Sequence, residues 1–241
     1  MSETHINYLY NYKTIKEEII NIKKNTNLLV VTKNQNFDKI KELINIGHCD
    51  FAENKVQEAS DKWSEVLKIN KNIQLHLIGK LQSNKVKDAF TLFNFIHTLD
   101  NEKLANKFHE IEKNAHKKIK FFIQVNIGNE DQKNGIKTDL LKDFVNLCKY
   151  DLKLDVIGLM CIPPKDLDPE NFFNKMRSLS TENNLKELSM GMSSDYKLAI
   201  KCGSTFVRIG SSIFSWVLLI LFLFEYFFLF EIINLIILFF L

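Results

Sequence analysis

The chain has 241 residues, of which 46% are hydrophobic and 25% are charged, values that are ordinary for a globular protein. Its net charge of +3 is small and its lysines are scattered without a block of like charges, so no nucleic-acid-binding surface is indicated. The first 24 residues are polar-rich, and the four cysteines form no C-x-x-C pair, so we expect no secretory signal, no metal site and reduced thiols in the cytoplasm.

Short apolar runs alternate with amphipathic segments along the chain. Helical spacing of apolar residues predicts helices at residues 6–24, from 37 to a stop at Gly47, at 54–69, from about 83, and at 102–117, 138–150, 169–183 and 194–202. The apolar runs between them predict strands at residues 28–31, 50–52, 75–79, 93–97, 120–127, 154–160, 185–190 and 206–209.

This alternation predicts parallel strands joined by crossover helices. Eight strands favour a single-domain α/β fold, a closed (β/α)₈ TIM barrel over residues 1–214 that includes the N-terminal helix. An open, doubly wound sheet is the alternative. Residues 215–241 form a separate apolar tail.

In such a barrel the active face lies at the carboxyl ends of the strands. Lys33 directly follows the first predicted strand, where an apolar neighbourhood would desolvate its amine and favour attack on an aldehyde. The chain has 32 Lys and Arg residues, and only Arg177 and Arg208 are arginines, so most lysines must be solvated surface residues. Position alone therefore supports a chemical role for Lys33 only weakly.

Two small polar clusters follow the seventh and eighth predicted strands. They are residues 191–194 (GMSS) and 210–212 (GSS), placed where barrels often bind phosphate. The serines could equally be helix caps. Arg208 lies on a strand between them, and its planar fork could contact a ring nitrogen or form a strand-end ion pair. A lysine, a phosphate cradle and this arginine together suggest pyridoxal 5′-phosphate (PLP).

Several ordered motifs carry a resemblance to a known family. The chain resembles the PLP homeostasis proteins, single-domain relatives of the alanine racemase N-terminal barrel. The resemblance covers about residues 7–214. Its motifs are residues 31–33 (VTK), 51–58 (FAENKVQE), 76–85 (HLIGKLQSNK), 124–126 (QVN), 133–135 (KNG), 158–160 (GLM), 188–195 (LSMGMSSD), 203–204 (GS) and 207–214 (VRIGSSIF).

The resemblance implies a role for each of eight cofactor-binding residues. Lys33 would form the aldimine with PLP, Arg208 would face the pyridine nitrogen, and Ser193, Gly210 and Ser211 would hold the phosphate. The pocket walls would include Asn54, His76 and Met192. For His76 a hydrogen-bonded, pocket-shaping role is favoured over acid–base work.

Members of this family are regarded as carriers or regulators of PLP without established turnover, and PLP-dependent apoenzymes are the candidate recipients. We therefore expect a cytoplasmic, non-catalytic monomer or weak homodimer. A PLP-dependent racemase or decarboxylase is the alternative, although racemisation needs a second acid–base group for which this chain has no residues to spare. A membrane-anchored interaction protein on a barrel scaffold is a third possibility.

The sequence departs from the family in two places. Ala52 stands where the family usually has glycine, which is a mild change. Beyond Ser215, the family's short charged helix is replaced by a run in which residues 217–241 contain 21 Leu, Ile, Phe or Val. This tail is expected to be either a membrane anchor or a misread gene end, and only the anchor would make the protein membrane-associated.

Overall fold

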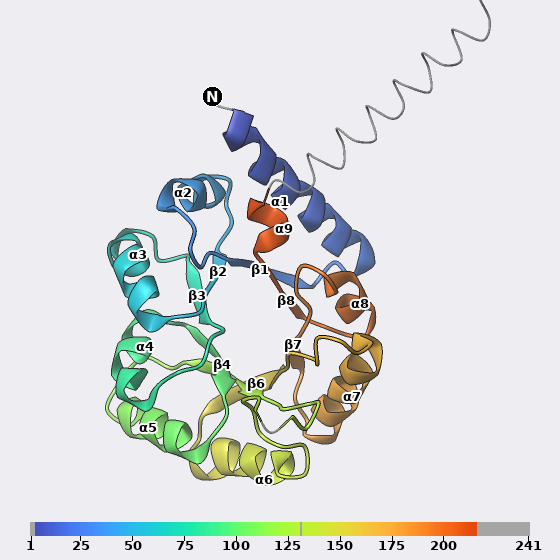
Figure 1. Cartoon of the computed structure of the whole chain (residues 1–241). Coiled ribbons are helices and arrows are strands. Elements are labelled where there is room, and N and C mark those ends of the chain that lie inside the picture. Colours follow the sequence, from blue (N-terminus) through green and yellow to red (C-terminus); the bar gives the residue numbers. More distant parts are fainter. Residues whose placement is uncertain (1–2, 131, 216–241) are drawn as a thin grey trace, which may run out of the picture.

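The strands form a closed parallel barrel. The computed structural model describes residues 3–130 and 132–215, and within them eight strands pair in the order β1 to β8, with β8 returning to β1. Figure 1 shows the strands at the centre of a ring of helices. The strands are β1 (Asn27–Val31), β2 (Asp50–Glu53), β3 (Gln74–Leu77), β4 (Phe95–Leu99), β5 (Lys120–Gln124), β6 (Asp155–Met160), β7 (Glu187–Ser189) and β8 (Phe206–Ile209).

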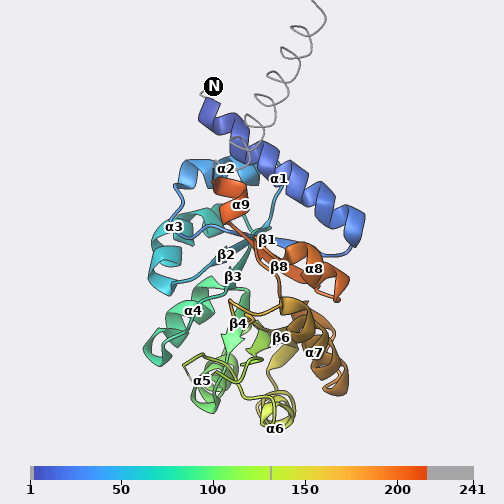
Figure 2. The ribbon, with the colours of Figure 1, turned by 45° about the vertical axis from the view of Figure 1, so that its right-hand side comes forward.

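Helices lie on the outside of the barrel; α1 precedes β1, α9 follows β8, and the others connect successive strands (Figures 1 and 2). They are α1 (Glu3–Ile22), α2 (Phe37–Asn45), α3 (Val56–Ile69), η1 (Ser83–Lys85), α4 (Val86–Leu92), α5 (Glu102–Glu112), α6 (Leu141–Asn146), η2 (Leu147–Asp151), α7 (Pro169–Glu182), α8 (Tyr196–Lys201) and α9 (Ser211–Phe214). Side-chain caps begin several of them: Asn36 accepts from the Asp38 N–H, Asn101 from Leu104 and Asp168 from Glu170.

The predicted (β/α)₈ barrel is confirmed, and each predicted strand overlaps an observed one. Strand β4, predicted at residues 93–97 and observed at Phe95–Leu99, is displaced by two residues at both ends, because the buried Phe93 caps α4 instead of opening the strand. Strand β5, predicted at residues 120–127, ends three residues earlier at Gln124. The helix predicted at residues 138–150 is also shorter, since it ends in the π-helical turn η2. The boundary at residue 214 stays a prediction, and the tail beyond Ser215 lies outside the described residues.

Apolar side chains fill two layers. The larger cluster lies between the strands and the helices and includes Phe51, Trp63, Phe108, Phe121 and Phe173. The smaller cluster fills the barrel interior: Leu29, Val31, Ala52, Phe122, Met160 and Phe206. Strands buried on both faces read as nearly continuous apolar runs, which explains why the eight runs were visible in the sequence.

Helix α1 packs beside α8 and α9 (Figures 1 and 2). The buried Asn11 amide donates to the carbonyl of Ile213 at 3.1 Å, and Glu18 accepts hydrogen bonds from the side chains of Tyr196 and Lys197. The N-terminal helix thus fixes the short helix that follows the last strand.

All four cysteines are free thiols, as expected. Among residues 3–130 and 132–215, no helix has the length and apolarity needed to cross a membrane.

Two isoleucines provide a test of the core. Ile40 of α2 is fully buried, whereas Ile69 at the end of α3 is 88% exposed. Ile40→Ala should lower the free energy of unfolding by about 2–5 kcal/mol, because it removes buried methyl groups and leaves a cavity. Ile69→Ala, the same substitution at the surface, should change it by about 0.5 kcal/mol or less. Urea unfolding measures both, and equal losses would contradict the described packing.

Candidate functional site

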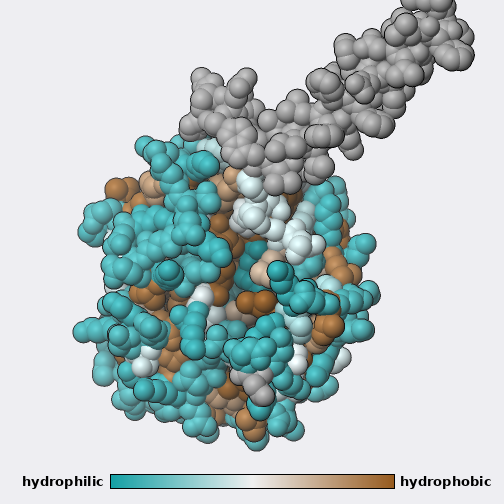
Figure 3. Space-filling model, viewed as in Figure 1, coloured by the Kyte–Doolittle hydropathy of each residue, from teal (hydrophilic) through white to brown (hydrophobic). Residues whose placement is uncertain are grey.

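The predicted site residues gather at the carboxyl ends of the strands. Lys33 lies just beyond β1, Asn54 just beyond β2, Met192 and Ser193 beyond β7, and Gly210 and Ser211 beyond β8. Arg208 and His76 lie within β8 and β3, with their side chains buried. The face in Figure 3 is largely hydrophilic, with a hollow near its middle bordered by apolar residues.

The two predicted phosphate loops contact each other. The Ser211 hydroxyl donates to Ser193 Oγ at 2.9 Å, and the backbone N–H of Ser212 donates to the same oxygen at 3.3 Å. Ser211 is exposed and Ser193 is half-buried, so both hydroxyls remain open to a ligand. At the start of α9 the N–H groups of Ile213 and Phe214 donate to the Gly210 carbonyl, whereas no described residue accepts from the Ser211 N–H, which adds one donor beside these hydroxyls.

Closure of the barrel brings this loop next to the lysine strand. Leu29 of β1 pairs with Arg208, and Val30 pairs with Ile209. A Cβ atom on Gly210 would lie 2.9 Å from the carbonyl oxygen of Val31, so a residue without a side chain is needed at this crossing. Lys33 and Ser211 therefore follow neighbouring strands.

Arg208 is a buried cation that does not use all of its N–H hydrogens in hydrogen bonds to the described residues. Its Nη1 donates to the carbonyl oxygen and the Oγ of Ser189 at 2.7 and 2.8 Å, and its Nη2 donates to the Cys161 carbonyl at 3.0 Å. A guanidinium has five N–H hydrogens. The Nε–H and the second Nη2 hydrogen meet no acceptor within the part of the chain that the structure describes.

Burial lowers the pKa of Arg208, while Cys161 and Asp195 oppose that shift, and the guanidinium stays charged. Burial also raises the pKa of the Cys161 thiol to about 12, which keeps this cysteine neutral. Arg208 is therefore a fixed positive charge at the mouth.

Lys33 is exposed, so the expected desolvation of its amine by the protein's own residues is wrong. Its backbone is nevertheless held on both sides. The Thr32 hydroxyl donates to Glu53 at 2.7 Å, and the Asn34 N–H donates to Glu58. Asn34 has a φ of 59°, a left-handed conformation that this bond helps to hold. The lysine thus extends from an anchored turn.

A buried ion pair supplies that anchor. Glu53 is fully buried and accepts from Lys62 Nζ at 2.8 Å and from the Trp63 indole N–H at 3.0 Å. Lys62 also donates to the Thr32 carbonyl at 2.7 Å and to Glu58 at 3.1 Å. Helix α3 therefore clamps the end of β1.

The three residues predicted to line the pocket differ in burial and in their contacts. Asn54 is half-buried, and its carbonyl is only 2.0 Å from where a Cβ on Gly79 would lie, so the ends of β2 and β3 approach closely. Met192 is exposed at 37%. His76 is fully buried inside the barrel and hydrogen-bonds to His97 and Asp50, which agrees with a shaping role.

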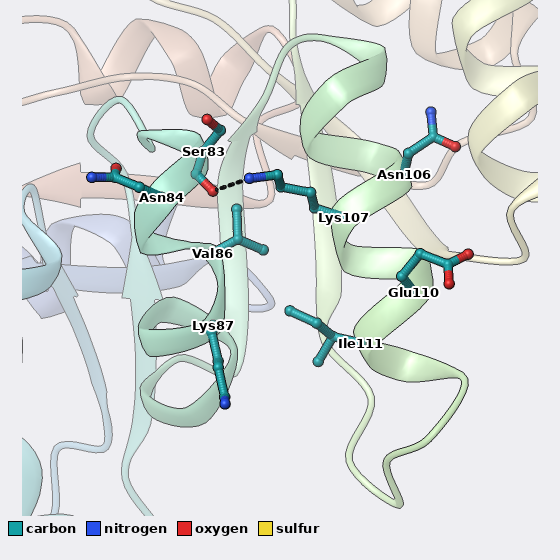
Figure 4. A pocket seen from close by; sticks show the side chains of 8 residues that line it. All are labelled: Ser83, Asn84, Val86, Lys87, Asn106, Lys107, Glu110 and Ile111. Carbon is teal, nitrogen blue, oxygen red and sulfur yellow. Dashed lines mark hydrogen bonds between the residues drawn. The ribbon is translucent and has the colours of Figure 1, made fainter.

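A separate groove of about 430 Å³ lies on the outside of the barrel, between η1–α4 and α5. Figure 4 shows Lys107 reaching across it to the Ser83 carbonyl, a contact of 2.7 Å. Asn84 lines this groove and not the carboxyl ends of the strands.

Comparison with known proteins assigns the family. Residues 7–216 match the family described as "Alanine racemase, N-terminal domain". The chain is 40% identical over 203 residues to the pyridoxal phosphate homeostasis protein of Aquifex aeolicus, covering 78% of this chain and 86% of the relative. It is 35% identical over 231 residues to that of Haemophilus influenzae, covering 87% and 96%. The chain belongs to the pyridoxal phosphate homeostasis protein family.

Solved structures agree with this assignment. PipY of Synechococcus elongatus with PLP bound is 30% identical, with a TM-score of 0.74 and coverage of 83% of this chain and 100% of PipY. Alanine racemase of Corynebacterium glutamicum shares the fold at 12% identity, with a TM-score of 0.65 and coverage of 87% of this chain and 60% of the racemase.

Sequence reasoning missed Ser189, His97 and Lys62 in the candidate site. Ser189 and His97 lie on apolar strands and connect to Arg208, while Glu53 and Lys62 hold the lysine turn. A polar residue inside an otherwise apolar strand was the available signal for Ser189 and His97. No local pattern marked the pairing of Lys62 with Glu53.

The contribution of the Lys62–Glu53 ion pair can be tested with two lysines of α3. Lys62→Met leaves the buried Glu53 carboxylate without its cation and should lower the free energy of unfolding by about 3–5 kcal/mol. Lys68 is 69% exposed and pairs with the exposed Glu65, so Lys68→Met should cost about 1 kcal/mol or less. Urea unfolding compares them, and a Lys62→Met variant as stable as Lys68→Met would rule the clamp out.

Proposed function

We propose that this chain binds PLP at the carboxyl end of its barrel and takes part in PLP homeostasis. The observation that carries the proposal is Arg208, a buried cation with two N–H hydrogens unused, set in a family whose member PipY has been solved with PLP bound. When bound, PLP supplies an aldehyde that an amine can attack and an electron-withdrawing ring.

The site offers a suitable partner for each part of the proposed cofactor. The pyridine nitrogen is a hydrogen-bond acceptor, and Arg208 would donate to it. The phosphate is an anion, and Ser193 and Ser211 would donate to it together with backbone N–H groups at Gly210 and Ser211. Asn54 and Met192 would border the ring, while His76 would shape the interior beneath it. The donor set therefore fits PLP.

Lys33 is the proposed point of covalent attachment. Its anchored turn follows the strand paired with β8, so the amine extends from beside the proposed phosphate loop. In the described chain its Nζ makes no hydrogen bond or ion pair, so the amine is free to react. Its exposure indicates that bound PLP, not the protein alone, would shield it.

The proposed role is non-catalytic. Arg208 would donate a hydrogen bond to the ring nitrogen and could not protonate it, which would leave the ring a weak electron sink. A PLP-dependent racemase or decarboxylase is the second candidate, because proteins with those activities share the fold. The proposed partners are PLP and PLP-dependent apoenzymes as recipients, the proposed location is the cytoplasm, and the proposed assembly is a monomer or weak homodimer.

The proposed domain division is a PLP-binding barrel over residues 1–214 and a tail over residues 215–241. The tail is proposed to be a misread gene end, with a membrane anchor as the alternative. Mass spectrometry of the native protein decides: a peptide from residues 216–241 would overturn the first and favour the second.

The attachment site gives a direct prediction. Borohydride reduction of the PLP-loaded protein should fix one cofactor to Lys33, as identified by peptide mass spectrometry. Lys33→Ala should abolish this covalent product yet retain weak binding through the phosphate contacts, which do not depend on the lysine. Lys33→Arg should not restore the product, because a guanidinium does not deprotonate in proteins.

Lys80 and Lys85 are the matched controls, since they also lie beyond a strand end and are present in the same sample. Their substitution by alanine should leave the labelled peptide unchanged. Cofactor found on either of them, or on no lysine, would refute the assignment of Lys33.

The non-catalytic role predicts that the PLP-loaded protein turns over no amino acid above trace. Chiral chromatography of alanine, lysine and other amino acids measures racemisation, and amine detection measures decarboxylation. Steady turnover near the usual enzyme rate of ~10 s⁻¹ would instead establish the second candidate.

A further inference from the structure

A chain of buried polar side chains crosses the barrel interior from Arg208 to the opposite end. Ser189 Oγ contacts Arg208 at 2.8 Å and His97 Nδ1 at 2.9 Å. His97 Nε2 lies 3.0 Å from His76 Nδ1, and His76 Nε2 lies 3.3 Å from Asp50 Oδ1. His76, His97 and Ser189 are fully buried, whereas Asp50, at the start of β2, is 35% exposed.

The end nearest the mouth sets the direction of these hydrogen bonds. A guanidinium can only donate, so Ser189 Oγ accepts from Arg208. Among residues 3–130 and 132–215 the only other hydrogen-bond partner of this oxygen is His97 Nδ1, so the single hydroxyl proton is donated there. His97 then carries its own proton on Nε2 and donates it to His76 Nδ1. His76 in turn carries its proton on Nε2 and donates it to Asp50.

Asp50, at the other end of the series, independently requires the same donor-to-acceptor direction. An ionised carboxylate can only accept, so Asp50 requires the proton of His76 on Nε2. That leaves His76 Nδ1 as an acceptor and again places the proton of His97 on Nε2. Both ends therefore select the same neutral tautomer for each ring. A second proton on His76 would set two donors face to face, and a second proton on His97 would leave the Ser189 hydroxyl proton without an acceptor among the described residues.

The surroundings favour these neutral, fixed rings. His76 stacks on Phe95 with centroids 4.1 Å apart, and His97 stacks on Phe122 at 4.2 Å. Burial lowers the pKa of His76, opposed by Asp50. Burial also lowers the pKa of His97, and Arg208 is among the charges that lower it further.

The carboxylate of Asp50, at the far end of this series of hydrogen bonds, balances the charge of Arg208. A buried charge is normally paired, yet within residues 3–130 and 132–215 the hydrogen bonds of Arg208 go to carbonyl and hydroxyl oxygens only. The four hydrogen bonds align their dipoles between a cation and an anion. Each bond is thereby strengthened by its neighbours in a medium of low dielectric constant.

We propose that Asp50, His76, His97 and Ser189 are positioning residues for Arg208, forming a polarised chain that aims its unused N–H hydrogens at the ring nitrogen of PLP. The assignment of PLP to Arg208 rests on the proposed function. The direction of the hydrogen bonds from Arg208 to Asp50 does not rest on the proposed function, because these bonds are present without a ligand.

The first experiment uses the PLP-free protein. Long-range ¹H–¹⁵N NMR of the imidazoles at neutral pH should report both His76 and His97 as neutral rings protonated on Nε2. A ring protonated on Nδ1, or an imidazolium, would overturn the polarised chain.

The second experiment asks whether the chain acts on the cofactor site. Ser189→Ala should lower affinity for PLP about tenfold, as expected for losing one hydrogen bond to a charged group, and should shift the absorption maximum of the bound cofactor. Ser189→Thr keeps the hydroxyl and should retain the wild-type spectrum. Ser180→Ala is the matched control, since Ser180 is equally buried and donates one hydrogen bond outside the barrel interior.

Asp50→Ala probes the far end of the chain, with Asp155→Ala at the start of β6 as its control. A cofactor spectrum changed by the first and not by the second supports action through the chain. Wild-type affinity and spectrum in both Ser189→Ala and Asp50→Ala would overturn the positioning role while the proposed function stands. A wild-type protein that takes up no PLP would refute the proposed function and the positioning role together, and the NMR result would remain valid for the chain alone.

Discussion

The pairing of β8 with β1 is the constraint on which the site depends. Four residue pairs, from Asn27 with Phe206 to Val30 with Ile209, close the barrel. In an open sheet the first and last strands could lie at opposite edges, and Lys33 would be remote from the loop that begins at Gly210. Closure makes them neighbours, and α1 reinforces it by bonding to the carbonyl of Ile213 beyond β8.

Closure also creates an interior that water does not reach, which makes each buried polar group costly unless it is bonded. The interior cluster of Phe122, Met160 and Phe206 is apolar, yet Arg208 and two histidines lie among the same strands. Each of these polar side chains makes a hydrogen bond to another strand. Polar interior residues here link strands that are distant in sequence, in addition to shaping the mouth.

The fold was predictable because parallel strands buried on both faces leave continuous apolar runs, such as residues 28–31 and 206–209. Polar residues at strand ends were predictable for the same reason. Position along a run was harder to predict: Phe93 is as apolar as a strand residue but caps α4, so His97 was expected at the end of β4 and lies in its middle. Contacts such as Arg208 with Cys161, which are 47 residues apart, leave no local pattern.

The exposure of Lys33 was mispredicted for a related reason. An apolar strand indicates where the chain is buried, but it does not indicate how far the next side chain extends beyond the core. The turn at Lys33 is fixed by Glu53 and Glu58, which follow later in the chain. Its anchoring could therefore be recognised only in three dimensions.

The hydrogen bonds of the cations at the mouth separate their roles. Lys62 has three N–H hydrogens and three acceptors, so nothing remains for a ligand and its part is structural. Arg208 has five hydrogens and three acceptors, which leaves two. Lys33 makes no hydrogen bond in the described chain.

This count does not distinguish Lys33 from Lys80, which also makes no hydrogen bond among the described residues. Topology makes the distinction. Lys33 follows the strand that pairs with β8, beside Gly210 and Ser211, whereas Lys80 follows β3, which pairs with β2 and β4. Barrel closure therefore distinguishes Lys33, the amine proposed to react, from Lys80, and the two unused N–H hydrogens distinguish Arg208, the cation proposed to orient the ring.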